Sequence, residues 1–216
     1  MAAIPTDARF LPFKTKMEAE GLSTSAIAAF GHSFMELMSG NSGMIEEASI
    51  TPASALPNLI GDIAGKVTPN SELLKETVVL KLNGGLGTGM GLDKAKSLLE
   101  VKGGNTFLDL TAKQVISMRK KFKSPVKFML MNSFNTSADT LAFLAKYPSL
   151  SEDPTVELMQ NKVPKISKAD HTPATHAQNP NNEWCPPGQY VMLMFRGLLL
   201  YTAIVIFQIE WCTMKP

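Results

Sequence analysis

Five glycines follow an apolar run near the middle of the chain, and a lysine lies shortly after them. The stretch is Leu80-Lys-Leu-Asn-Gly-Gly-Leu-Gly-Thr-Gly-Met-Gly91, and Lys96 comes five residues later. Glycine lets the backbone approach a ligand and adopt positive φ without a steric penalty, and successive N–H groups in such a turn attract anions. Because a lysine supplies a compact positive charge for phosphate, these residues predict a loop that binds a phosphorylated small molecule.

The glycine loop fits neither of the two common phosphate-binding patterns. A Walker loop places a lysine directly after its last glycine, but Met90 follows Gly89 here. A dinucleotide-binding loop needs glycines at its first, third and sixth positions. The sixth position is Met90 when counted from Gly85 and Leu92 when counted from Gly87. A structural turn between a strand and a helix is the alternative to a ligand loop.

The elements around this loop predict a parallel α/β sheet. Runs of β-branched and apolar residues indicate strands at 77–82, 126–131 and 156–159. Apolar residues at helical spacing indicate helices at 106–122 and 136–147. A strand–helix–strand–helix–strand order is typical of a parallel sheet with right-handed crossovers.

Polar residues follow all three predicted strands. They are the glycine loop after Leu82, the pair Asn132 and Ser133 after the second strand, and Gln160 after the third. Ligands of open parallel sheets bind outside the carboxyl ends of the strands. We therefore expect these polar groups to meet at one ligand-binding edge.

The residues before the sheet predict a helical segment. Residues 23–40 carry apolar side chains at helical spacing, and Ser23 or Ser25 can cap the first turn. Prolines and glycines interrupt residues 41–71, which indicates short helical turns and a linker.

Composition excludes several classes of function. A chain of 216 residues can hold one large or two small domains. The net charge of +2 comes with no basic stripe, so a nucleic-acid partner is not expected. Cys185 and Cys212 lack the spacing of a metal or redox site. The amino terminus lacks the layout of a signal peptide, and together these features predict a reducing, cytoplasmic setting.

Taken in order, the motifs resemble those of the sugar-nucleotide pyrophosphorylases. The glycine loop, Lys96-Ser-Leu-Leu99 and Thr106-Phe-Leu-Asp109 carry the general resemblance. Leu82-Asn-Gly-Gly85 together with Met131-Asn-Ser-Phe-Asn-Thr136 narrows it to the UDP-glucose pyrophosphorylases, also called UTP–glucose-1-phosphate uridylyltransferases. Gln160-Asn-Lys-Val-Pro-Lys-Ile166 and Glu183-Trp-Cys-Pro-Pro-Gly188 are similar to the same family, so the resemblance covers residues 62–188.

The resemblance implies a fold and a division of the chain. The fold would be α/β, an incomplete doubly wound, Rossmann-like nucleotide-diphosphosugar transferase sheet preceded by a helical amino-terminal segment. Residues 1–75 would form that helical segment and a linker. Residues 76–188 would form the first half of the nucleotidyltransferase catalytic domain, and residues 189–216 a divergent apolar tail.

The resemblance also implies a reaction and a set of site residues. UTP and glucose 1-phosphate would give UDP-glucose and pyrophosphate, with Mg²⁺ as the cofactor. Leu82, Asn83, Gly84 and Gly85 would hold the uridine and the start of the triphosphate, and the loop from Gly87 and Thr88 to Gly91 would wrap the phosphates. Lys96 would be catalytic and neutralise phosphate charge. Met131 would border the base, Gln160 would hydrogen-bond the uracil edge, and Gly188 would let the backbone meet the nucleotide.

The chain departs from the family pattern at two places. Ala95 stands where the family usually has a proline before the phosphate-facing lysine. After Gly188 the family continues with His-Gly-Asp, whereas this chain continues with Gln189-Tyr-Val-Met and lacks the family's metal ligands. A truncated, inactive fragment that binds UTP is therefore the alternative to an active uridylyltransferase.

The apolar residues 191–209 have three interpretations. They are an accidental tail without a selected role, strands that complete the sheet, or a membrane segment. A spanning helix needs about 20 apolar residues, but Arg196, Gly197 and Gln208 interrupt this run. Its valine, isoleucine, phenylalanine and tyrosine content also suits strands. A membrane-tethered product is accordingly the least favoured hypothesis.

Overall fold

The computed structural model describes residues 3–41, 43–87, 91–187 and 203–207, the last of these as backbone only. The chain divides into two compact units. One is formed by residues 1–69 and 163–185, and the other by residues 70–162 and 186–216. The predicted limits at 75 and 188 stay a prediction.

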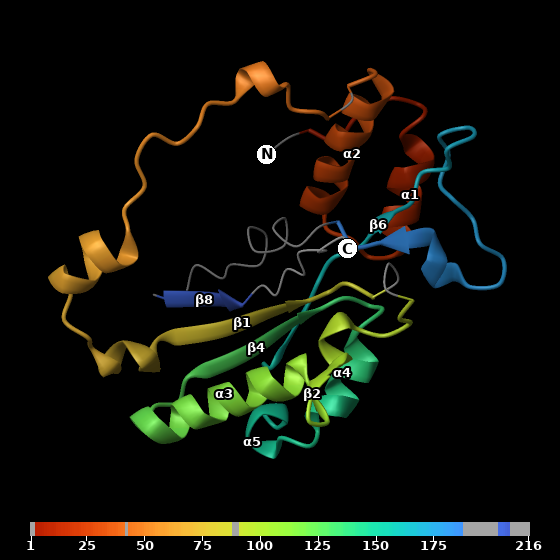
Figure 1. Ribbon diagram of the computed structural model, residues 1–216. Coiled ribbons are helices and arrows are strands. Elements are labelled where there is room, and N and C mark those ends of the chain that lie inside the picture. Colours follow the sequence, from red (N-terminus) through yellow and green to blue (C-terminus); the bar gives the residue numbers. More distant parts are fainter. Residues whose placement is uncertain (1–2, 42, 88–90, 188–202, 208–216) are drawn as a thin grey trace. The chain divides into compact units, whose positions relative to one another are not determined.

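Two helices of the first unit pack against each other through aromatic side chains, and Figure 1 shows their ribbons side by side. They are α1 (Leu11–Ala19) and α2 (Thr24–Met38). The ring centroids of Phe13 and Phe34 lie 4.9 Å apart, and both side chains are buried. The hydroxyl of Ser23 accepts a hydrogen bond from the N–H of Ala26 and caps α2, which confirms the helix predicted from residue 23 to residue 40. Helix α1 was not predicted.

Short elements complete the first unit. They are η1 (Glu47–Ser49), η2 (Leu59–Ile63), η3 (Ala64–Lys66), β6 (Val163–Pro164), η7 (Pro180–Glu183) and β7 (Trp184–Cys185). The strands β6 and β7 form an antiparallel pair. Glu183 forms an ion pair with Lys16 of α1 and accepts the N–H of His176 at 2.9 Å. The prediction of short helical turns between 41 and 71 is confirmed.

A parallel sheet forms the centre of the second unit. Its strands are β1 (Thr77–Asn83), β4 (Lys127–Asn132), β5 (Glu157–Met159) and β8 (Ala203–Phe207), in the order β5-β4-β1-β8. The strand β1 pairs in parallel with both β4 and β8, and β4 with β5. The three strands predicted before the tail, and their parallel arrangement, are confirmed.

The strand β8 lies within the apolar run 191–209. Its five residues pair along β1 from Thr77 to Lys81, so the strand interpretation holds for this part of the run. The other residues of the run, 191–202 and 208–209, lie outside the described residues. Among the helices that the structure describes, none is long and apolar enough to cross a membrane.

Helices cover one face of this sheet (Figure 1). Following the turn η4 (Ser71–Lys75) and β1, the chain forms η6 (Lys96–Leu98), the hairpin strands β2 (Glu100–Lys102) and β3 (Asn105–Thr106), then α3 (Phe107–Phe122), α4 (Ser137–Leu144) and α5 (Pro148–Ser151). A capping box between Thr106 and Asp109 starts α3, as its sequence spacing predicts. Leu108, Ala112 and Val115 of α3 pack with Val79 of β1 in the main core.

Alternate residues of the strands form a second apolar cluster. Side chains alternate between the two faces of a strand, so Val79 faces the helices while Val78, Leu80 and Leu82 lie on the other face. In that second cluster they pack with Met129, Met131 and Leu158. The glycine loop thus begins at the end of β1, next to both apolar clusters.

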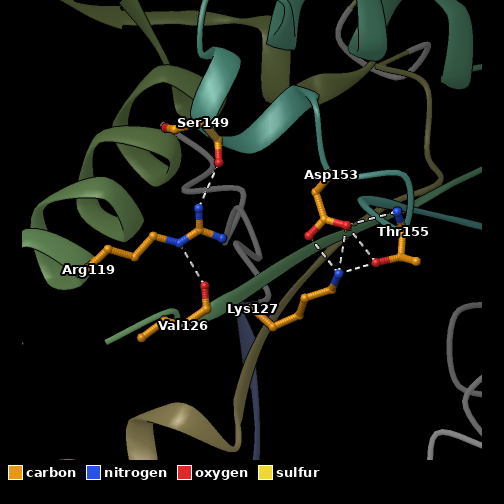
Figure 2. Close-up of polar contacts among 6 residues, drawn as sticks. All are labelled: Arg119, Val126, Lys127, Ser149, Asp153 and Thr155. Atoms are coloured by element: carbon orange, nitrogen blue, oxygen red, sulfur yellow. Dashed lines mark hydrogen bonds and ion pairs between the residues drawn. The ribbon is translucent and has the colours of Figure 1, made fainter. Parts of the chain in front are cut away.

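Polar contacts gather at the amino-terminal end of β4 (Figure 2). Lys127 donates to both carboxylate oxygens of Asp153, at 2.8 and 2.6 Å, and also contacts Thr155. Arg119 of α3 donates to the carbonyls of Val126, at 2.8 Å, and Ser149, at 2.7 Å. These contacts join α3, β4 and α5 at the end of β4 opposite to Asn132.

Candidate functional site

The carboxyl ends of three strands meet as the sequence predicts. Asn83 of β1 is paired with Asn132 of β4, and Asn132 is paired with Met159 of β5. The three strands therefore end at the same edge of the sheet. The next residue after each strand is Gly84, Ser133 or Gln160, and these three residues come together at that edge.

Leu82 and Met131 form an apolar floor beside this edge. They are register partners on the sheet face opposite α3 and α4, and they are 8% and 0% exposed. Both belong to the second apolar cluster and are the last apolar positions of their strands. Met131 is fully covered and Leu82 nearly so, which makes both part of the apolar core directly beside this edge.

Gln160 and Gly84 are in unusually close approach. Gln160 is 4% exposed, and its Oε1 is buried without a hydrogen-bond partner among the described residues. A Cβ on Gly84 would lie 2.1 Å from that Oε1, so only glycine fits at this position. A buried acceptor without a partner costs about 1–3 kcal/mol, which makes the Gln160 carbonyl a candidate for contact with a donor on a ligand.

Asn83 faces the helix layer. Its Nδ2 donates to Oδ1 of Asn132 at 2.7 Å and to Oγ1 of Thr140 at 2.9 Å. Asn132 in turn donates to Glu157 at 2.7 Å. Both amide hydrogens of Asn83 are already used in hydrogen bonds to Asn132 and Thr140. Any contact of Asn83 with a ligand would therefore use atoms other than Nδ2.

Two buried hydroxyls hold the start of the glycine loop. Oγ1 of Thr136 donates to the carbonyl of Asn83 at 2.8 Å, and Oγ of Ser133 donates to the carbonyl of Gly84 at 2.7 Å. Both side chains are 0% exposed. Sequence reasoning placed Ser133 among the polar groups at the ligand edge and Thr136 at the start of a helix, but it predicted neither contact with the glycine loop. The signal for these contacts was the position just after a strand, where serine and threonine commonly bond the backbone.

The glycine loop folds back on itself and brings Lys96 near its base. Leu86 and Ala95 form an isolated antiparallel bridge, and the N–H of Gly87 donates to the carbonyl of Lys94 at 3.1 Å. A Cβ on Gly87 would lie 2.6 Å from Leu92, so the loop closes tightly only with glycine there. Gly91 has a φ of 70°, which favours glycine as well.

Lys96 is exposed at the start of η6, directly after the bridge. Its side chain has no ion-pair or hydrogen-bond partner among the residues that the structure describes. Its ammonium group is therefore available to a ligand at the loop. Gly85 is also exposed at the loop's start. Two predicted site residues, Thr88 and Gly188, lie outside the described residues.

Lys81 is a buried charge that the sequence did not single out. It lies on the face of β1 that carries Val79 and Asn83, and it is 3% exposed. Burial lowers the pKa of its ammonium group below the ordinary value. Since Lys81 lies inside the sheet and not at the edge, we assign it no contact with a ligand.

The described residues do not supply a protein metal site. Within 3–41, 43–87 and 91–187, no group of three or more histidine, cysteine, aspartate or glutamate side chains could hold a metal ion. Cys185 is a free thiol whose pKa is raised by burial. Mg²⁺ is commonly held by one or two carboxylates together with the phosphates of a substrate, so a magnesium ion that enters with a nucleotide does not need such a cluster.

The arrangement is that of an α/β protein with a ligand edge at the carboxyl ends of parallel strands. The chain belongs to the UTP–glucose-1-phosphate uridylyltransferase family, whose sequence profile matches residues 27–199.

Similar proteins support this assignment. The chain is 43% identical over 131 residues to the UTP–glucose-1-phosphate uridylyltransferase of Solanum tuberosum. This match covers 57% of this chain and 27% of the relative. It is 42% identical over 118 residues to a probable UTP–glucose-1-phosphate uridylyltransferase of Schizosaccharomyces pombe, which covers 54% of this chain and 23% of that relative.

Solved structures agree with the fold. A variant of UDP-glucose pyrophosphorylase from Leishmania major in complex with UDP-glucose matches 86% of this chain and 38% of its own, with a TM-score of 0.77 and 44% identity. The UDP-glucose phosphorylase from Trypanosoma brucei matches 84% of this chain and 39% of its own, with a TM-score of 0.78 and 48% identity. The chain thus matches between 23% and 27% of the length of the two curated relatives and less than half of each solved chain.

Proposed function

We propose that this chain binds UTP at the carboxyl edge of β1, β4 and β5. The observation that carries the proposal is the buried, unpartnered Oε1 of Gln160 beside Gly84. Uracil has an N–H between two carbonyl groups, so its edge offers the donor that this oxygen lacks. Cytosine has no hydrogen on the corresponding ring nitrogen, so the same oxygen would discriminate between the two bases.

The rest of the nucleotide would extend from this point along the glycine loop. The base would lie on Leu82 and Met131, and the backbone of Gly84 and Gly85 would meet the uridine. The loop from Gly87 onward would surround the triphosphate, with Thr88 in it. Gly188, from the residues after β7, completes the predicted set.

Lys96 would neutralise charge during transfer of the uridylyl group. In the family reaction, a phosphate oxygen of glucose 1-phosphate forms a bond to the α-phosphorus of UTP, and the bond to pyrophosphate breaks. Such a transfer depends on positioning and charge stabilisation more than on a protein nucleophile. Magnesium would enter with the nucleotide. The reaction would take place in the cytoplasm.

A second candidate is a UTP-binding chain without turnover. It is favoured by the fraction of the relatives that is matched, which is 27% or less for the curated proteins above. Residues for the sugar phosphate would lie in the remainder of a full-length relative. The two candidates share the nucleotide site and differ only in catalysis.

Calorimetry with UTP in magnesium buffer tests the shared site. We expect binding by the unaltered chain and a loss of roughly tenfold in affinity for Lys96→Ala, since one charge-assisted hydrogen bond to phosphate is removed. Lys102→Ala removes the same charge from an exposed position on β2 and should leave the affinity unchanged. Equal affinities for Lys96→Ala and the unaltered chain would show that Lys96 does not face the phosphates.

A coupled assay for pyrophosphate release separates the two candidates. Turnover with glucose 1-phosphate supports the uridylyltransferase. UTP binding with no release of pyrophosphate supports the non-catalytic chain.

A further inference from the structure

The first two peptide groups of the glycine loop point their carbonyls to one place. The carbonyl oxygens of Asn83 and Gly84 accept hydrogen bonds from Thr136 and Ser133, and the two hydroxyl oxygens lie only 3.3 Å apart. In an extended strand successive carbonyls point in opposite directions. The chain must therefore turn at Gly84, where the absence of a side chain also allows the approach to Gln160.

This orientation fixes the direction of two N–H groups. A trans peptide group is planar, with its N–H antiparallel to its C=O. The N–H of Gly84 belongs to the peptide whose carbonyl Thr136 holds, and the N–H of Gly85 to the one that Ser133 holds. Both N–H groups consequently point away from the turn at 133–136. Successive N–H groups turned to one side form a concavity that attracts an electronegative oxygen.

The hydroxyls are themselves held in place. The N–H of Ser133 donates to Oγ1 of Thr136 at 3.0 Å, and the N–H of Thr140 in α4 donates to the carbonyl of Thr136 at 3.1 Å. Both hydroxyls are fully buried, so water does not compete for them. The start of α4 is thus a rigid support for the loop.

We propose that Ser133 and Thr136 are positioning residues for nucleotide recognition. By holding two carbonyls, they aim the N–H groups of Gly84 and Gly85 away from the turn at 133–136. There the two donors can meet a carbonyl of the uracil edge at the position where cytosine carries an amino group instead. This inference rests on the proposed UTP site, but it assigns base selectivity to residues that do not touch the base.

The test compares variants at Thr136 for their affinity to UTP and to CTP. Thr136→Val removes the hydroxyl at nearly constant volume, whereas Thr136→Ser keeps it. We expect Thr136→Val to lose roughly three- to tenfold in UTP affinity, with a smaller loss for CTP, so that the UTP-to-CTP ratio falls. Thr136→Ser should keep the ratio of the unaltered chain, and Ser133→Ala should lower it as Thr136→Val does.

A matched control distinguishes positioning from general destabilisation. Thr111 in α3 is 6% exposed and its hydroxyl also donates to a backbone carbonyl, that of Phe107 at 3.0 Å. Thr111→Val should lower the melting temperature to a similar degree without changing the UTP-to-CTP ratio. Because Ser133→Ala is a smaller change, it provides the measurement if Thr136→Val does not fold.

The outcomes separate this inference from the proposed function. Binding of UTP by the unaltered chain with an unchanged UTP-to-CTP ratio in both hydroxyl-free variants would overturn the positioning role alone. An equal fall of the ratio in Thr111→Val would also overturn it. Absence of UTP binding by the folded, unaltered chain would overturn the proposed site and this inference together.

Discussion

The phenol oxygen of Tyr147 lies 2.6 Å from Oδ1 of Asp109, and the contact joins the start of α3 to the segment between α4 and α5. Asp109 also accepts the N–H of Thr106 at 2.8 Å and forms an ion pair with Lys146 at 2.9 Å. Burial opposes ionisation of Asp109, but these donors outweigh it and lower its pKa. Burial and the bond to Asp109 raise the pKa of Tyr147 to about 12. The Asp109 carboxylate therefore holds the start of α3, the helix that follows the β2–β3 hairpin, against Lys146 and Tyr147.

Tyr147→Phe should destabilise the fold. The variant keeps the ring in the core and removes one hydrogen bond to a buried carboxylate, which we expect to cost about 1–2 kcal/mol in the free energy of unfolding. Lys146→Met removes another donor to the same carboxylate, but Lys146 is 47% exposed and should cost less than about 1 kcal/mol. Urea denaturation of both variants checks the order, and an equal or larger loss for Lys146→Met would contradict it.

Acid should weaken the contacts at the opposite edge of the sheet (Figure 2). Partial burial opposes ionisation of Asp153, yet hydrogen bonds from Lys127 and Thr155 lower its pKa to about 2. A depressed pKa in the folded state means that the unfolded state binds the proton more tightly. The stability from Asp153 is therefore present above its unfolded pKa of 3.8 and is lost as the pH falls toward 2.

Asp153→Asn should flatten this part of the acid profile. The unaltered chain should lose stability between about pH 4 and pH 2 more steeply than the variant, since the variant has no proton to take up at this position. Denaturation midpoints across this range check the difference in slope. Parallel profiles would show that Asp153 has the same pKa in both states.

Local sequence signals predicted much of the fold because they act within a few residues. The Thr106 and Asp109 spacing gave the start of α3 through a capping box. Continuous apolar runs gave β1, β4 and β5, since strands of a parallel sheet are buried on both faces. Helix α1 has only nine residues, and its Phe13 packs against Phe34 of the next helix, a tertiary contact that the spacing within α1 does not reveal.

The sequence predicted which residues lie near one another at the site, but it did not predict the hydrogen bonds between them. The order of the elements placed Gly84, Ser133 and Gln160 at one edge, and the structure brings these three positions together. The hydroxyl contacts of Ser133 and Thr136 span about 50 residues of sequence, at separations of 49 and 53. No periodicity or motif spacing encodes such a tertiary contact, so its role emerged only from the structure.

Lys81→Met should stabilise the chain. Lys81 as a residue is 3% exposed and its side chain has no ion pair among the described residues, so its charge opposes folding. We expect the variant to gain about 1 kcal/mol or more at neutral pH, because methionine keeps the length of the side chain without the charge. Lys102→Met, at an exposed site, should change stability little.

The stabilisation by Lys81→Met should shrink as the pH rises. The pKa of Lys81 is lowered by burial in the folded state, so the unfolded state binds more protons between the folded pKa and the ordinary value of 10.5. Stability of the unaltered chain therefore rises with pH in this window, while the variant lacks this dependence. Urea denaturation of both from about pH 7 to pH 10 measures it, and a constant difference would contradict the assigned burial.

Gly84→Ala should disturb the fold through one side chain. The added Cβ would lie 2.1 Å from Oε1 of Gln160, a distance that real contacts do not reach. We expect a lower melting temperature and no measurable UTP binding. Gly85→Ala is the matched control for stability, because an added Cβ there meets nothing within 4 Å.

A second substitution identifies the cause. The double variant Gly84→Ala with Gln160→Ala removes the atom that the new methyl group meets, so its melting temperature should recover toward that of Gln160→Ala alone. UTP binding should not recover, because the proposed acceptor for the uracil N–H is gone. Two effects on stability that simply add would instead place Gln160 away from Gly84, since independent sites are additive and contacting ones are not.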